Sequence, residues 1–139
     1  LWVSAYSAGR SLQAHAINHH YYIVSATSAR DCQVYDITGA RLHYSRSGRI
    51  NIATVTLDLD RCLFHYDFHM EKRARLLAEH GEEVELEEDL PQEAWFVLHA
   101  RQPGVSARRL AAAYGLEELR DYKLRSRREL DTLRGHSIR

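Results

Sequence analysis

The clearest fold signal in the sequence is the passage Gly9-Arg-Ser-Leu-Gln-Ala-His-Ala-Ile-Asn-His-His-Tyr-Tyr-Ile-Val-Ser-Ala-Thr27. Ser11 can cap a helix that runs to about His20, because a serine side chain accepts a hydrogen bond from an early helical N–H. The residues at i, i+3, i+4 and i+7 that share one face of this helix are Leu12, His15, Ala16 and His19. Aromatic and β-branched residues then predict a strand from Tyr21 to Thr27.

An apolar strand precedes this passage. It reads Leu1-Trp-Val-Ser-Ala-Tyr6, and it begins without a starting methionine, a turn or a helix cap. We therefore expect this chain to be the rear portion of a larger protein whose functional groups lie partly upstream of Leu1.

Further strands are predicted up to residue 60. The segment Cys32–Asp36 is a strand candidate, and Ile37-Thr-Gly39 turns the chain into Ala40–Tyr44, which predicts a hairpin. The segment Ile50–Leu59 alternates apolar and polar residues along its whole length. This pattern predicts the best strand of the chain, with one buried face.

The sequence becomes helical and strongly charged after residue 60. A helix containing Phe64, Phe68 and Leu76 is expected to end near Gly81, and Glu82–Asp89 is expected to be a solvated acidic loop or a frayed helix. Ala94–Leu98 is expected to be a short apolar anchor. We divide the chain into a strand-rich part at 1–78, an acidic loop at 79–93 and a helical C-terminal extension at 94–139.

The extension contains a Pro103-Gly104 turn and two predicted helices. Ser106 can cap the first, which runs to Tyr114 and ends at Gly115. The second spans about 117–134, and the residues at helical spacing along it are Leu119, Tyr122, Ser126, Leu130 and Leu133.

Composition is that of an ordinary globular protein of 139 residues, with 45% hydrophobic and 27% charged residues. Nineteen basic and nineteen acidic residues cancel, so no global charge recruits nucleic acid or a membrane. Residues 79–100 hold eight acids and no Lys or Arg, whereas residues 101–139 hold ten basic and five acidic residues. This asymmetry indicates either a basic partner surface or an acidic loop folded over a basic tail.

The chain contains two cysteines, Cys32 and Cys62, which is too few for a disulfide framework. We expect both to be reduced thiols at buried positions. There is no signal peptide, and the apolar runs are shorter than the ~20 residues of a membrane helix. These features favour the cytoplasm and no membrane partner.

Five short pieces of the sequence resemble the nitrilase, or carbon–nitrogen hydrolase, superfamily. Val3–Tyr6 resembles the family's Pro-Ser-Ala-aromatic strand end, Gln13–His19 resembles its Ala-Arg-Ala-Ile-Glu-Asn helix, and Tyr22–Val24 resembles its next strand. Downstream, Gln33–Gly39 is similar to its Ser-x-Ile-x-Asp-Pro-x-Gly hairpin, and Ala53–Leu59 to its closing Ala-x-Ile-Asp-Leu strand. The resemblance covers roughly residues 1–78.

This resemblance implies a fold and a reaction. The fold is an α/β, four-layer α-β-β-α sandwich, of which this chain supplies the C-terminal part, followed by a helical tail. The reaction is hydrolysis of a non-peptide C–N bond in an amide, a carbamoyl compound or a nitrile, through a thioester on a cysteine. The family uses a Glu base, a Lys and this Cys, needs no cofactor and commonly forms homo-oligomers. All three catalytic residues precede the Ser-Ala-aromatic strand, so the 139-residue chain alone is expected to be inactive.

The resemblance also suggests residues around the substrate. Those that could line the pocket are Ser4, Ala5, Tyr6 and Thr27, although ordinary strand packing explains them equally well. His15 and Asn18 could support the active site from the helix. The family usually has Arg, Glu and Asn where this chain has His15, Asn18 and His19, and often has Pro at the position of Ile37. These departures indicate a divergent subgroup.

Two histidine pairs have the i, i+4 spacing of a metal site, namely His15 with His19 and His65 with His69. No carboxylate or cysteine at ligand spacing completes either pair, and the family that the chain resembles uses no metal. We therefore predict no metal, and we expect the first pair to lie on the helix face that packs against the sheet.

A different class of function has some support in the tail. Ala111 and Gly115 have a spacing typical of a helix-turn-helix, and several basic residues follow that could contact phosphates: Arg120, Lys123, Arg125, Arg127 and Arg128. A small DNA-binding regulator is thus the alternative to the hydrolase. Glu117, Glu118 and Asp121 stand where base contacts would be made, which favours packing of this helix on its own domain or across a dimer.

Overall fold

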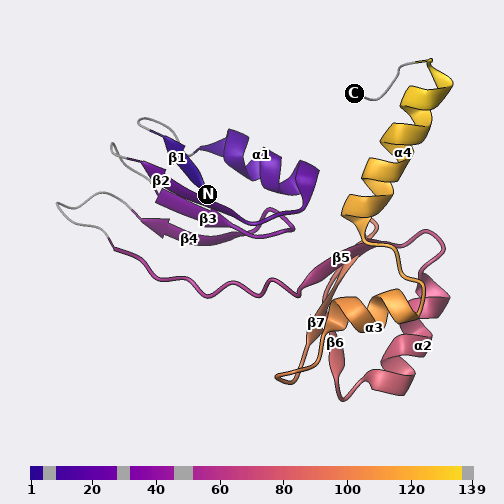
Figure 1. Ribbon diagram of the computed structural model, residues 1–139. Coiled ribbons are helices and arrows are strands. Elements are labelled where there is room, and N and C mark those ends of the chain that lie inside the picture. The colour runs from indigo at the N-terminus through magenta and orange to yellow at the C-terminus, as the bar shows by residue number, and fades with distance from the viewer. Residues whose placement is uncertain (5–8, 28–31, 46–51, 136–139) are drawn as a thin grey trace. The chain divides into compact units, whose positions relative to one another are not determined.

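The structure is a computed structural model, and it describes residues 1–4, 9–27, 32–45 and 52–135. The chain is a mixed α and β protein that divides into two compact units, residues 1–58 and 59–139 (Figure 1). This division falls 20 residues before the predicted boundary at 78/79. We describe each unit by itself.

The first unit is a four-stranded sheet with one helix. Its elements are β1 (Trp2–Ser4), α1 (Arg10–His19), β2 (Ile23–Thr27), β3 (Cys32–Tyr35) and β4 (Arg41–Ser45), and the strand order is β1-β2-β3-β4. β1 and β2, which α1 connects along the chain, pair in parallel. The pairs β2–β3 and β3–β4 are antiparallel. The predicted strand–helix–strand and the hairpin are both confirmed.

The helix packs on one face of this sheet through a small apolar core of Leu12, Ala16, Ile23 and Tyr35. The cap prediction was wrong, because Gly9 rather than Ser11 is the N-cap of α1 and no side chain caps it. The predicted buried face was half wrong, since His15 and His19 are exposed. Their rings stack on each other with centroids 5.8 Å apart. Leu12 and Ala16 are the two buried residues of α1, and both lie on the face that packs on the sheet.

The turn between β3 and β4 is fixed by Asp36, which is only 1% exposed. Its Oδ1 accepts hydrogen bonds from the backbone N–H of Thr38 and of Ala40, at 2.9 and 2.8 Å, and from the Thr38 hydroxyl at 2.8 Å. Aspartate favours such turns because its short side chain reaches the backbone two residues on. Gly39 follows with φ +88°, a conformation that favours glycine.

The predicted strand at Ile50–Leu59 was wrong where the structure describes it. Ile50 and Asn51 lie outside the described residues, and residues 52–58 belong to no strand. They run extended across the face of the sheet opposite α1, with Val55 and Leu57 half-buried. The Tyr22 hydroxyl donates to the Asp58 carbonyl at 2.8 Å. Alternating apolar residues supply a buried face, but a strand also needs a partner with free backbone groups.

The second unit is a three-stranded antiparallel sheet with three helices. Its elements are β5 (Cys62–His65), α2 (Met70–His80), β6 (Val84–Leu90), β7 (Trp95–Ala100), α3 (Ala107–Ala113) and α4 (Leu119–Leu133), with strand order β5-β7-β6. The core consists of Cys62, Phe64, Leu76, Val84, Phe96, Leu98, Ala107, Ala111 and Leu116. The central strand β7 is the segment that we expected to be only an apolar anchor.

Two predictions for this unit were wrong. Phe64 lies in β5 and Phe68 precedes α2, so neither belongs to the predicted helix, and the predicted acidic loop contains the strand β6. Arginines from neighbouring segments neutralise the acids of β6. Arg61 contacts Glu87 at 2.5 Å and Glu88 at 2.8 Å, and Arg101 contacts Glu85 at 2.9 Å. Val84 is fully buried, so apolar residues between the acids can pack while the charges stay at the edge.

The helical tail follows the prediction closely. The Ser106 hydroxyl caps α3 by accepting a hydrogen bond from the Arg109 N–H at 3.1 Å. Gly115 ends the helix with φ +70°. α4 then runs from Leu119 to Leu133, within the predicted limits. Among the described helices, none is long and apolar enough to cross a bilayer.

Candidate functional site

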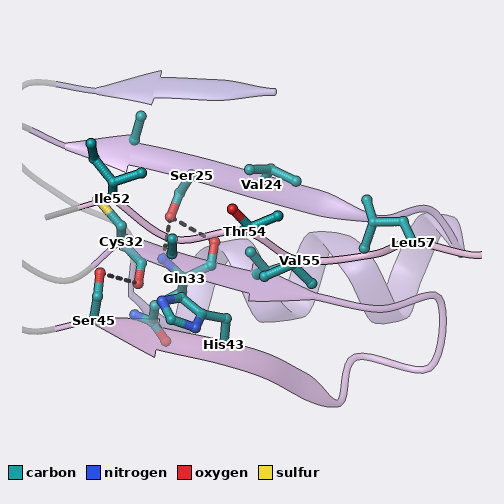
Figure 2. A pocket seen from close by; sticks show the side chains of 13 residues that line it. Val24, Ser25, Cys32, Gln33, His43, Ser45, Ile52, Thr54, Val55 and Leu57 are labelled. Carbon is teal, nitrogen blue, oxygen red and sulfur yellow. Dashed lines mark hydrogen bonds between the residues drawn. The ribbon is translucent and has the colours of Figure 1, made fainter.

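A hollow in the first unit lies over the face of the sheet that points away from α1. It has a volume of about 530 Å³ and is bounded on one side by β2, β3 and β4 and on the other by residues 52–57 (Figure 2). Such a volume is within the range of small-molecule pockets.

Strand register explains which side chains reach this hollow. Val24 pairs with Val34, and Val34 with His43, so these three share one face; Cys32 pairs with Ser45 on the same face. The opposite face carries Ile23 and Tyr35, which contact α1. Ile52, Val55 and Leu57 close the hollow from the other side.

The chemistry of the hollow is neutral. Its lining contains no Asp, Glu, Lys or Arg side chain among the described residues. The Cys32 sulfur lies 3.5 Å from the Thr27 N–H, which donates to it, and 4.0 Å from the Thr27 carbonyl. Within the described residues, Cys32 has no hydrogen bond to His43, so the pair does not form the nucleophile–base arrangement of a cysteine hydrolase.

A hydrogen-bonded network borders the hollow, whose lining includes Ser25 and Gln33 (Figure 2). The Ser25 hydroxyl donates to the Gln33 carbonyl at 3.0 Å and accepts from the Gln33 N–H at 2.8 Å. The Tyr35 hydroxyl donates to the Gln33 side-chain oxygen at 2.6 Å, and burial raises the pKa of Tyr35. These groups are buried and satisfied, which indicates a structural role.

The structure describes four of the six residues that we predicted around the substrate, and they lie in two places. Ser4 and Thr27 are direct neighbours in the β1–β2 pair, at the carboxyl ends of the two parallel strands. Ala5 and Tyr6 lie outside the described residues. His15 and Asn18 are exposed on α1, across the sheet from the hollow. Sequence reasoning missed Val34 and His43, because only strand register shows that they face the same hollow.

The two cysteines lie in β3 and β5, and the second histidine pair lies in β5 and at the start of α2. Cys62 is fully buried and Cys32 half-buried, so the expectation of burial holds fully for Cys62 only. His65 lies in β5 and His69 precedes α2, so their i, i+4 spacing does not place them on one helix face. No group of three potential metal ligands occurs among the described residues.

The tail carries the other candidate site, the α3–α4 helix pair. The acidic residues between α3 and α4 form ion pairs with nearby arginines. Glu118 contacts Arg108 at 2.5 Å and Arg120 at 3.8 Å, and Arg125 contacts Glu117 at 2.9 Å. The Glu117 N–H donates to the buried His69 Nε2 at 3.1 Å, which ties the start of α4 to the turn before α2.

These ion pairs predict a local pH dependence. The Arg125 hydrogen bonds hold the pKa of Glu117 below its usual value of 4.5. The pKa of Glu117 is therefore lower in the folded chain than in the unfolded chain. The stabilisation by the Glu117–Arg125 pair is fully present at pH values above the unfolded pKa, and it is lost as the pH falls through the folded pKa. We expect the protection factor of the Glu117 amide, which corrects its exchange rate for the intrinsic slowing of exchange in acid, to fall at acidic pH. Arg125→Gln should remove most of this dependence, whereas Arg128→Gln should leave it unchanged.

No protein-family model, no curated protein and no solved structure matches this chain significantly.

Proposed function

We propose that this chain is the C-terminal portion of a nitrilase-like carbon–nitrogen hydrolase. The main support is the parallel pairing of β1 with β2, which α1 connects, and the β3–β4 hairpin that follows them. This is the element order that the sequence resemblance implies. The pairing sets Ser4 beside Thr27 at the carboxyl ends of two parallel strands, the edge where α/β proteins commonly bind ligands.

The proposed reaction needs groups upstream of Leu1. A cysteine thiolate would attack the carbonyl carbon of an amide, and the C–N bond would break as a glutamic acid gives its proton to the leaving amine. A lysine would stabilise the negative oxygen of the tetrahedral intermediate. Water would then attack the thioester and release the acid. In this proposal, the sheet of the first unit and α1 form two layers of a four-layer sandwich in a cytoplasmic homo-oligomer.

DNA binding by the tail has weaker support. The predicted pair of helices is present, but Glu117 and Glu118 stand at the start of α4 and hold Arg125 and Arg108 in ion pairs. A recognition helix normally presents its first turns to the bases. Carboxylates at that position repel phosphates, so we do not propose a DNA-binding function.

The test begins with the coding sequence immediately before Leu1. We expect a continuous reading frame that contains Glu, Lys and Cys in this order. The longer protein should release ammonia from simple aliphatic amides, and the 139-residue chain should release none. Replacing the upstream cysteine by alanine should abolish release without unfolding the longer protein. A start codon directly before Leu1, or a longer protein without these three residues, would contradict the proposal.

A further inference from the structure

Two imidazole rings lie side by side on the surface of α1. His15 and His19 are both exposed, and their ring centroids are 5.8 Å apart with an angle of 16° between the ring planes. Packing of this pair against the sheet, which we expect from the sequence, would close it to a metal ion. Because the rings are exposed instead, an ion can reach both of them from solvent.

The pair belongs to a helix that its own unit holds in place. Leu12 and Ala16 are buried and fix α1 on the sheet. The ring of His19 also stacks on that of Tyr21, just beyond the end of the helix, with centroids 5.6 Å apart. Groups that are already arranged side by side lose little conformational freedom when they bind a common ligand.

The spacing of the two histidines suits a chelate. Residues four apart on a helix are neighbours on one face. Rotation about the histidine χ2 bond has a broad energy profile, so each exposed ring can turn one nitrogen toward a common ion at about 2.0–2.1 Å. No group of three potential ligands occurs among the residues that the structure describes, so water completes the coordination of such an ion.

The chemistry of the pair selects the kind of ion. Residues 11–27 contain no Asp, Glu, Lys or Arg, so this segment offers neutral nitrogen ligands and no carboxylate. Mg²⁺ and Ca²⁺ prefer oxygen ligands. Imidazole suits Cu²⁺, Ni²⁺ and Zn²⁺, and among these ions a given site binds Cu²⁺ most tightly.

We infer that His15 and His19 form a two-histidine chelate site for a late first-row transition-metal dication, with Cu²⁺ as the tightest ligand. The bound ion links two consecutive turns of α1 and stabilises this ten-residue helix. This inference goes beyond the proposed hydrolysis, because it requires no catalytic group and no residue upstream of Leu1.

The site is measured by calorimetric titration of the full chain with Cu²⁺, Ni²⁺ or Mg²⁺ at about pH 7.5, where imidazole is mostly neutral. Cu²⁺ should bind most tightly, and Mg²⁺ should not bind. His15→Asn and His19→Asn, in separate variants, should each weaken the tightest Cu²⁺ binding by about tenfold or more, because a single ring forms no chelate. Electron paramagnetic resonance should show Cu²⁺ coupled to nitrogens of both rings in the original chain and of one ring in each variant.

The matched control keeps the number of histidines but changes their spacing. His15→Asn with Ala14→His places the two rings five residues apart on different faces of α1, so it should bind Cu²⁺ as weakly as His15→Asn alone. Ala14 is exposed, so the added ring needs no room in the core. His80→Asn, in the second unit, should leave the affinity unchanged. Circular dichroism should show equal helix content in all variants.

Bound Cu²⁺ should also slow hydrogen exchange of the α1 amides in the original chain and not in His19→Asn. Absence of tight Cu²⁺ binding, or unchanged Cu²⁺ affinity in His15→Asn or in His19→Asn, would overturn the inference. Full affinity in the variant with altered spacing would also overturn it, as would an equal loss of affinity in His80→Asn.

Discussion

Phe96→Ala should lower the free energy of unfolding of the unit 59–139 by about 3–5 kcal/mol. Phe96 is fully buried in the central strand β7, and its ring stacks on Phe64 with centroids 5.3 Å apart. The guanidinium of Arg73 lies 5.0 Å from the centre of the same ring. Truncation therefore removes buried apolar surface and leaves a cavity between the sheet and α2, which the surrounding packed side chains fill only in part.

Urea unfolding measures this loss when it is followed by fluorescence in a Trp2→Phe background, where Trp95 is the remaining tryptophan. The matched control is Phe68→Ala, which makes the same chemical change at a side chain that is 91% exposed. Phe and Ala both carry a Cβ and bear the same backbone strain at the Phe68 φ of +62°, so the replacement should cost nothing measurable. Should Phe96→Ala prevent folding, Phe96→Leu gives a milder loss that can still be measured. Equal midpoints for Phe96→Ala and Phe68→Ala would contradict the core that we describe.

Gly39→Ala should destabilise the unit 1–58 by about 2–4 kcal/mol. Gly39 has φ +88°, and a Cβ built there would lie only 2.2 Å from Cγ1 of Ile17 on α1. Isoleucine is β-branched and has few rotamers on a helix, so it cannot easily move away. The turn is also tied to α1 by the Gln13 side-chain amide, which donates to the Gly39 carbonyl at 3.0 Å.

A second glycine separates the two causes of this loss. Gly104 has φ +87° but nothing within 4 Å of its would-be Cβ, so Gly104→Ala should cost only the backbone strain of about 1–2 kcal/mol. Adding Ile17→Ala to Gly39→Ala should recover the remainder. Hydrogen exchange of the β3 and β4 amides reports the first unit, and that of β7 reports the second. Equal losses for the two glycine variants would show that Gly39 does not approach Ile17.

Local sequence signals predicted several elements correctly because the interactions concerned are themselves local. Ser106 caps α3 through a neighbour three residues away, and Gly115 ends the helix by its own backbone freedom. The turn after β3 depends on Asp36 and on residues within four positions of it. Such features need no information about the rest of the fold.

Other elements depended on distant partners, and there the predictions failed. The many acidic residues of β6 predicted a loop. In the structure β7 pairs with this segment, and Arg61 forms ion pairs with two of its carboxylates. Residues 52–58 alternate as a strand should, yet they form none. The face shared by Val34 and His43 follows from the β3–β4 register, which the sequence does not state.

The sequence by itself determined the helix and turn signals, the strand–helix–strand order and the absence of a net charge, because neighbouring residues and composition suffice for these. Only the tertiary structure decided that the acidic stretch is a strand, that His15 faces away from the sheet and that a neutral hollow lies opposite α1. Strand pairing and burial join residues that are far apart in sequence, so no local pattern specifies them.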